Sequence, residues 1–196
     1  METLTEIDKF AFLWINQWVG RNPAIDSVVI LLVSDYFVPV VTSLALFALW
    51  LSGQNQLALE TNQRTVLIAI LSVLITALTI ALMNTVFDRP RPFEELNVSL
   101  LFYRPTDSSF PANPVAIVTA MSSSVCIRTP RLGVPLLALM LVFALSRVYA
   151  GVFYPFDVLG GAAIGFISAS VSYTIAKFSE PAMAILLHRL RVLYLA

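Results

Sequence analysis

The feature that most constrains this chain is an uncharged stretch of twenty-three residues, 65–87. At about 1.5 Å per residue, a helix of this length crosses the roughly 30 Å hydrocarbon core of a bilayer. Hydrophobic residues make up 58% of the 196 residues and charged residues only 12%, whereas soluble domains have about 45–50% and about 25%. We therefore expect an all-α integral membrane protein and exclude a soluble or disordered chain.

Four further apolar segments accompany this stretch. The expected spans are 25–51, 65–87, 114–127, 132–150 and 158–176. Together they predict a bundle of about five or six transmembrane helices in a single domain, 1–196. Polar loops at 53–64 and 88–112, a turn at 128–131 and a short loop at 151–156 connect the spans. Gly161 and Gly165 have the spacing that favours close helix packing in membranes.

The residue pattern at each end of the chain predicts a helix at the membrane surface. In the N-terminal region, 1–24, apolar residues recur at helical spacing: Ile7, Phe10, Trp14 and Trp18. We expect this amphipathic helix to lie in the membrane interface or against the edge of the bundle, with a true span as the alternative. At the other end, 181–196 predicts a C-terminal interfacial helix that carries His188, the only histidine of the chain.

Charge and ligand counts exclude several classes of function. Twelve basic and twelve acidic residues give a net charge of zero, so no basic excess favours nucleic acid as a partner. A single cysteine, Cys126, excludes an intramolecular disulfide and a cysteine-rich metal site. We expect no metal and no cofactor.

The distribution of basic residues predicts which side of the membrane each loop faces. Six fall on one side: Arg64, Arg128, Arg131, Lys177, Arg189 and Arg191. Four fall on the other: Arg89, Arg91, Arg104 and Arg147. Because cytoplasmic loops carry the excess of Lys and Arg, we expect the first set to be cytoplasmic and the 88–112 loop to face outside.

Three polar segments are predicted to meet at that outer end of the bundle. They are 84–92 (NTVFDRPRP), 109–114 (SFPANP) and 146–157 (SRVYAGVFYPFD). In order and spacing they resemble the motifs of the PAP2 (type 2 phosphatidic acid phosphatase) superfamily: Lys, six residues, Arg-Pro; then Pro-Ser-Gly-His; then Ser-Arg, five residues, His, three residues, Asp. The chain is most similar in look to bacterial undecaprenyl diphosphate phosphatases. That resemblance implies a bacterial-type inner membrane with the site on its outer side.

The resemblance also implies a mechanism, and this chain departs from it. The family uses one histidine as nucleophile, a second as general acid and an aspartate that orients a histidine, while lysine, arginine and serine hold the phosphate. Five positions differ here: Asn84 for the lysine, Ala112 for the serine, Asn113 for the glycine, Pro114 for the acid histidine and Phe153 for the nucleophilic one. The matching residues are Arg91, Arg147 and Asp157, with Arg89 as an additional cation.

The Asn113-Pro114 pair predicts a changed helix start. Asn is a strong N-cap residue and Pro is favoured at the first helical position. We expect the Asn113 side chain to satisfy one amide and Pro114 to remove another, which would weaken anion binding at this helix terminus.

The retained charges leave two interpretations open. In the first, Asp157 pairs with Arg147, and Arg91 pairs with Asp88 or Asp107, as partly buried ions require. In the second, Arg89, Arg91 and Arg147 hold the phosphate of a lipid headgroup without cleaving it.

The missing histidines shape the functional prediction. Neither Pro114 nor Phe153 offers a lone pair for nucleophilic attack, and neither can act as a general acid. We expect a catalytically inactive PAP2-like membrane protein that binds a lipid phosphate, or that is a subunit or assembly partner of a membrane complex. The alternative is an active lipid phosphatase, acting on undecaprenyl diphosphate or phosphatidate through an atypical site. Vanadate-type haloperoxidase chemistry is also excluded, because it needs the same two histidines.

Overall fold

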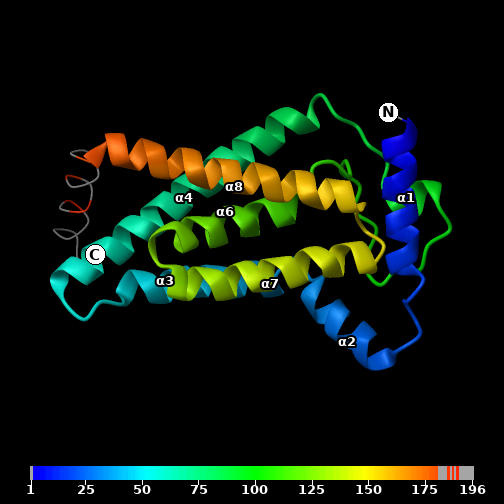
Figure 1. Cartoon of the computed structure of the whole chain (residues 1–196), viewed down its shortest axis with the longest axis horizontal. Helices are drawn as coiled ribbons and strands as arrows, with labels where there is room; N and C mark the ends of the chain where they lie inside the picture. The colour runs from blue at the N-terminus through cyan, green and yellow to red at the C-terminus, as the bar shows by residue number, and fades with distance from the viewer. Residues whose placement is uncertain (1, 181–184, 186, 188, 190–196) are drawn as a thin grey trace.

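The computed structural model describes residues 2–180, 185, 187 and 189. Within them the chain forms helices and no strands, as the sequence predicts (Figure 1). The helices are α1 (Glu2–Asn16), α2 (Pro23–Leu32), α3 (Phe37–Leu51), α4 (Gln56–Asn84), α5 (Pro92–Glu95), α6 (Asn113–Arg128), α7 (Pro130–Tyr149) and α8 (Pro155–Phe178). The expected C-terminal helix, 181–196, lies outside the described residues except for positions 185, 187 and 189. His188 also lies outside them.

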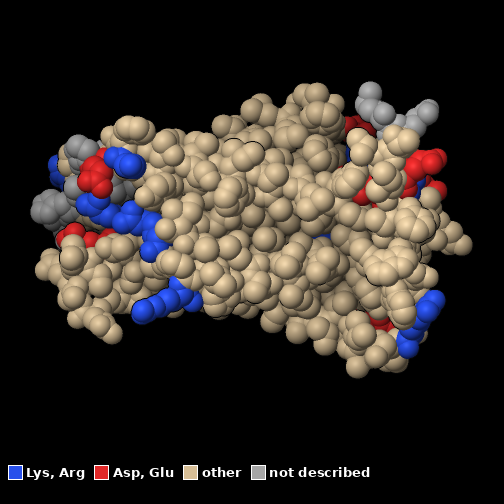
Figure 2. Space-filling view, in the orientation of Figure 1, with Lys and Arg blue, Asp and Glu red and all other residues tan. Residues whose placement is uncertain are grey.

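Apolar helices long enough to cross a membrane make up the body of the molecule. Among the described residues, α4, α7 and α8 meet this requirement singly, and the bent pair α2–α3 makes a fourth if it counts as one span. Helix α6, at 16 residues, is shorter. Each of the five expected spans is thus helical, and three or four qualify by length and composition. Figure 2 shows charged side chains at the two ends of the molecule and a band without them between.

Helix α6 is the centre of the bundle and packs against α4, α7 and α8. Its contact with α8 depends on glycine. A Cβ atom on Gly161 would lie 2.6 Å from the carbonyl oxygen of Ala112, and one on Gly165 would lie 2.3 Å from that of Ala116. The predicted role of this glycine pair is therefore confirmed: small residues let the two backbones approach.

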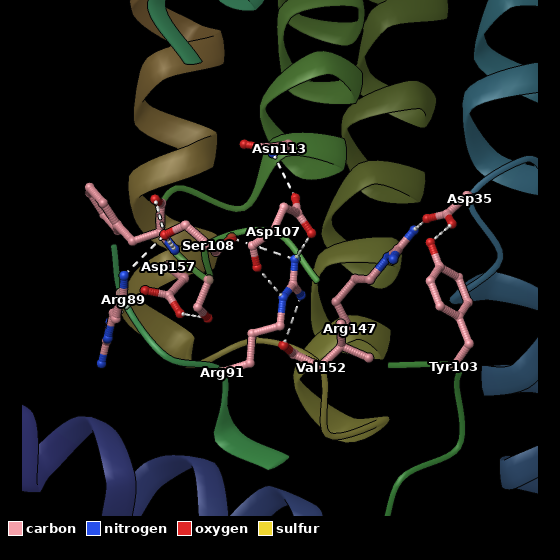
Figure 3. A network of polar contacts seen from close by, with 12 residues as sticks. Asp35, Arg89, Arg91, Tyr103, Asp107, Ser108, Asn113, Arg147, Val152 and Asp157 are labelled. Carbon is pink, nitrogen blue, oxygen red and sulfur yellow. Dashed lines mark hydrogen bonds and ion pairs between the residues drawn. The ribbon is translucent and has the colours of Figure 1, made fainter. Parts of the chain in front are cut away.

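The expected span 25–51 is not one straight helix: it is broken between Leu32 and Phe37, and its two parts are bent by 53°. Pro39 lies in the first turn of α3. It has no amide hydrogen to donate to the carbonyl of Asp35, four residues earlier, so it cannot continue a helix through this point and is tolerated in a first turn. Helical hydrogen bonding resumes with the amide of Val40, which donates to the carbonyl of Tyr36 at 2.8 Å. The break places Asp35 at the end of the bundle that carries the three motif segments (Figure 3).

The polar loop expected at 53–64 is also shorter than predicted, because α4 already begins at Gln56. The Asn55 side chain caps this helix by accepting a hydrogen bond from the amide of Ala58 at 2.9 Å. A side-chain cap of this kind satisfies one of the amides that a helix start leaves without a partner.

Helix α1 packs against α7 and α8 with polar residues inward. Asp8, Phe12 and Asn16, each four residues apart, are buried. The Asn16 side chain donates to the carbonyl oxygen of Tyr149 at 2.9 Å. Ile7, Phe10 and Trp14, whose spacing predicts the helix, lie on its exposed side, and Trp18, just after the helix, is also exposed.

Candidate functional site

The three motif segments meet at one end of the bundle and are joined by hydrogen bonds (Figure 3). The amide of Ser109 donates to the carbonyl of Arg89 at 2.9 Å, and the amide of Ala112 donates to the carbonyl of Asp157 at 3.1 Å. The Arg91 guanidinium donates to the carbonyl of Val152 at 3.2 Å. Each segment is thus tied to the other two, and Arg89, Arg91, Arg147 and Asp157 lie in one region.

Arg91 is buried, with only 2% of the residue exposed, and its donors are occupied by the chain itself. Its Nη2 donates to the Asp107 carboxylate at 2.7 Å, and its Nε donates to the Asp107 carbonyl at 2.9 Å. The guanidinium also stacks on the ring of Phe153, 4.3 Å from its centroid. Asp107 is one of the two partners predicted for Arg91, and Phe153 adds a cation–π contact.

Arg147 pairs with Asp35, so the predicted pair between Arg147 and Asp157 is wrong. Its Nη2 donates to Asp35 Oδ1 at 2.7 Å, and its guanidinium lies against the rings of Phe102 and Phe143. The second oxygen of Asp35 accepts the hydroxyl of Tyr103 at 2.6 Å. This hydrogen bond raises the pKa of Tyr103 above its usual value. The bend between α2 and α3 provides this partner.

Asp157 is fully buried, and its partners come from all three motif segments. It forms an ion pair with Arg89, accepts a hydrogen bond from the Ser109 hydroxyl, and accepts the backbone amide of Tyr154 at 3.2 Å. Arg89 lies between Asp157 and Asp8, donating to Asp8 Oδ2 at 2.7 Å. Burial would lower the pKa of Arg89, but the Asp8 hydrogen bond and the charges of Asp157 and Asp8 raise it overall.

Asp8 is the site residue that sequence reasoning missed. Its carboxylate holds Arg89 with one oxygen, and with the other accepts the amide of Phe156 at 2.9 Å, in the first turn of α8. A carboxylate at a helix N-terminus satisfies an unpaired amide and the helix dipole. The spacing of Asp8, Phe12 and Asn16 was the available signal, because it places a second stripe on the helix opposite the aromatic one.

The positions that depart from the family pattern contribute no polar group to this network, Asn113 excepted. Ala112 and Phe153 are buried. Asn84 ends α4, where its side chain is exposed and makes no hydrogen bond or ion pair with another described residue.

The predicted N-cap at Asn113 is wrong by one position. Ala112 is the N-cap of α6, and Asn113 and Pro114 are its first two residues. The Asn113 Nδ2 instead donates to Asp107 at 3.1 Å, while its buried Oδ1 has no hydrogen-bond partner. Because Asn113 has helical geometry, its side chain points away from the amides of its own helix and towards the loop that carries Asp107 (Figure 3).

The charged groups of the network are paired with one another. Three guanidinium groups, of Arg89, Arg91 and Arg147, face four carboxylates: Asp8, Asp35, Asp107 and Asp157. In their charged forms these groups sum to one negative charge. No cluster of three or more His, Cys, Asp or Glu side chains suited to a metal ion occurs within the described residues.

Comparisons of sequence and of structure find known proteins that are similar to this chain. The chain is 29% identical to the undecaprenyl-diphosphatase BcrC of Bacillus subtilis over 160 residues, 82% of this chain and 78% of that protein. The crystal structure of Aquifex aeolicus LpxE matches with a TM-score of 0.66 and 26% identity, covering 84% of this chain and 93% of that one. A phosphatidylglycerolphosphate phosphatase of the PAP2 type from Bacillus subtilis has the same TM-score at 15% identity and shows the fold alone.

The model of the PAP2 superfamily matches residues 65–180, which is more than half of the chain. This region begins in α4 and includes all three motif segments together with α6, α7 and α8. The helical bundle, the converging segments and this match lead to one conclusion: the chain belongs to the PAP2 superfamily.

Proposed function

We propose that this protein is a non-catalytic member of the PAP2 superfamily that acts in the membrane by binding other components. The observation that carries the proposal is the environment of Arg91. Its guanidinium is stacked on Phe153, at the position that the family pattern gives to the nucleophilic histidine, and is bound by the carboxylate of Asp107. An arginine in this state holds the protein together and is not poised to receive a phosphate.

The chemistry of the substituted positions supports the same conclusion. A phosphoryl-enzyme route needs a nucleophile with a lone pair, and leaving-group departure gains about 10²–10⁴-fold from a general acid. Phe153 and Pro114 supply neither. Asp157, which would orient a histidine in the family pattern, is bound here by Arg89 and Ser109.

The ion pairs favour an assembly role over lipid-phosphate binding at this site. Arg147 and Arg91 are each bound to an internal carboxylate, and the network as a whole is net negative. We infer that these residues fasten the outer ends of the helices. The protein then acts as a subunit or partner of other membrane proteins, in a bacterial-type inner membrane with this end outside.

The second candidate is an active lipid phosphatase with an atypical site. The similarity to a protein named as an undecaprenyl-diphosphatase favours it. On this alternative, undecaprenyl diphosphate or phosphatidate is the substrate, and the arginines release their carboxylates when it binds.

A phosphate-release assay on the purified full chain separates the two candidates. The substrates are undecaprenyl diphosphate and phosphatidate, and the Bacillus subtilis relative, purified in the same way, is the positive control. We expect no turnover by the wild type, by Phe153→His or by Pro114→His, because either repair alone leaves the other group missing and residues of this kind act as a unit. Wild-type turnover at about 1 s⁻¹ or faster, as enzymes show, would overturn the proposal.

A combined variant tests whether the scaffold could still support catalysis. It carries Asn84→Lys, Ala112→Ser, Asn113→Gly, Pro114→His and Phe153→His. Activity in this variant alone would mean that the chemistry was lost while the arginine positions remained usable. Absence of activity in every variant would mean that the motif region itself has been rebuilt around the ion pairs.

A further inference from the structure

A second cluster of cations lies at the opposite end of the bundle, where α4 begins and α6 and α8 end (Figure 1). A pocket of about 200 Å³ opens there between the three helices. Arg64 of α4, Arg128 of α6 and Lys177 of α8 contribute to its lining, together with Tyr173 and Glu180. Figure 2 shows cationic side chains gathered at this end. We call it the cationic pocket.

The cations of this pocket are poorly neutralised, unlike those of the motif region. Glu180 is the single carboxylate in the lining, its side chain is 68% exposed, and its closest approach to Arg64 is 3.4 Å. This distance exceeds the range of a good charged hydrogen bond. Arg128 Nε is buried without any hydrogen-bond partner among the described residues. Three cations and one acid leave the lining with two positive charges.

Glu180 is the one acidic side chain among the described residues that line the pocket. Residues 181–196 contain no Asp or Glu, and they add Arg189 and Arg191. A buried guanidinium nitrogen without a partner is costly, so a group that accepts its hydrogen bond is favoured here.

We propose that the cationic pocket binds a phosphate group, with the headgroup of an anionic phospholipid as its natural source. Phosphate oxygens accept several charged hydrogen bonds at once, and arginine and lysine are the side chains that supply them. The pocket also lies at the ends of α4 and α8, two of the helices that are long and apolar enough to span a membrane. Basic pockets between transmembrane helices are suited to lipid headgroups.

A purely structural role for the same residues makes a different prediction. Arg128 and Lys177 lie in the last turns of α6 and α8, where a cation interacts favourably with the helix dipole. That role gives stability without any dependence on a ligand. Ligand dependence is therefore the quantity to measure.

The test uses the full chain in a neutral detergent with dioctanoyl phosphatidylglycerol as the probe. Dioctanoyl phosphatidylcholine controls for the acyl chains, and binding is read by native mass spectrometry and by the shift of the thermal unfolding midpoint. We expect phosphatidylglycerol to bind more tightly than phosphatidylcholine. We also expect Arg128→Gln and Lys177→Gln each to weaken its binding about fivefold or more.

Arg131→Gln is the matched control, because Arg131 lies at the same end of the bundle, is exposed, and does not line the pocket. It should change binding much less than the other two variants. Lys177 is also exposed, so its variant is expected to fold. Equal binding of the two lipids, or an equal loss of binding in all three variants, would refute the proposed phosphate site. Such a result would mean that lipid binding depends only on diffuse surface charge.

Inorganic phosphate provides the last arm of the experiment. If it displaces phosphatidylglycerol at millimolar concentration, the source is soluble phosphate; if it does not, the source is the lipid, and both results support a phosphate site. The proposal is independent of catalytic silence at the other end, because none of these variants alters a motif residue.

Discussion

At the scale of single residues, Arg147 and Arg91 differ in the partners they would keep after losing a carboxylate. Asp35 is the ion-pair partner of Arg147, whose Nε has no hydrogen bond within the described structure. Arg91 also donates to backbone carbonyls. Removing one partner of a buried ion pair costs about 3–5 kcal/mol. We therefore expect Asp35→Asn to lower the free energy of unfolding by about 3 kcal/mol, and Asp107→Asn by clearly less, measured by unfolding in detergent.

A double variant controls for the stranded charge at this position. Asp35→Asn combined with Arg147→Met removes both ions, and replacing a buried pair by an apolar residue is often close to neutral. Its stability should therefore recover towards that of the wild type. Equal losses in Asp35→Asn and Asp107→Asn would contradict the argument, because they would show that the carbonyl partners of Arg91 count for nothing.

These two ion pairs differ in how well their partners can be predicted from the sequence. Arg91 and Asp107 are 16 residues apart in one loop, and their pairing was among those predicted. Arg147 and Asp35 are 112 residues apart, and they meet because α2 and α3 are bent. The requirement that each buried charge have a partner could be predicted, whereas the identity of a distant partner depends on backbone geometry.

At the scale of helices, the contact between α6 and α8 is expected to be sensitive to a single substitution, because its backbones lie so close together. A Cβ atom on Gly165 would meet backbone oxygen of Ala116 at 2.3 Å and Thr119 Cβ at 2.8 Å. Overpacking usually costs about 1–3 kcal/mol, and rigid backbone cannot yield cheaply. We expect Gly165→Ala to lower the thermal unfolding midpoint. Ala163→Leu, on the exposed side of the same helix, is the control; a larger loss there would refute the packing argument.

Helix type and order could be predicted from hydropathy, but helix ends could not. Apolar content is the same whether 25–51 is straight or bent, so only Pro39 and Asp35 signalled the break. Polar residues at 56–64 resembled a loop, although Asn55 was available as a cap. Hydropathy measures transfer into lipid, whereas helix ends depend on local hydrogen bonds.

At the scale of the whole molecule, the two ends differ in the state of their cations. At the motif end, Arg89, Arg91 and Arg147 are each bound to a carboxylate. At the other end, the cationic pocket keeps a positive excess. The sequence predicted two sets of basic residues on opposite sides, but a count of charges could not show that one set is neutralised from within.

The orientation of the two ends in the membrane is a prediction that labelling can test. The sequence prediction sets six basic residues on the pocket side against four on the motif side. Lys9, which pairs with Glu95, and Arg21, which stacks on Trp18 beside Tyr149, also lie at the motif end. The count is then six against six, so the orientation with the pocket side cytoplasmic stays a prediction to be tested. The test introduces single cysteines by Gln54→Cys or Asn97→Cys, both at exposed positions, in a Cys126→Ala background. In intact cells, a membrane-impermeant maleimide should label the Asn97 variant and leave the Gln54 variant unlabelled until the membrane is permeabilised. Labelling of the Gln54 variant alone in intact cells would reverse the orientation, and with it the side on which a lipid headgroup could reach the cationic pocket.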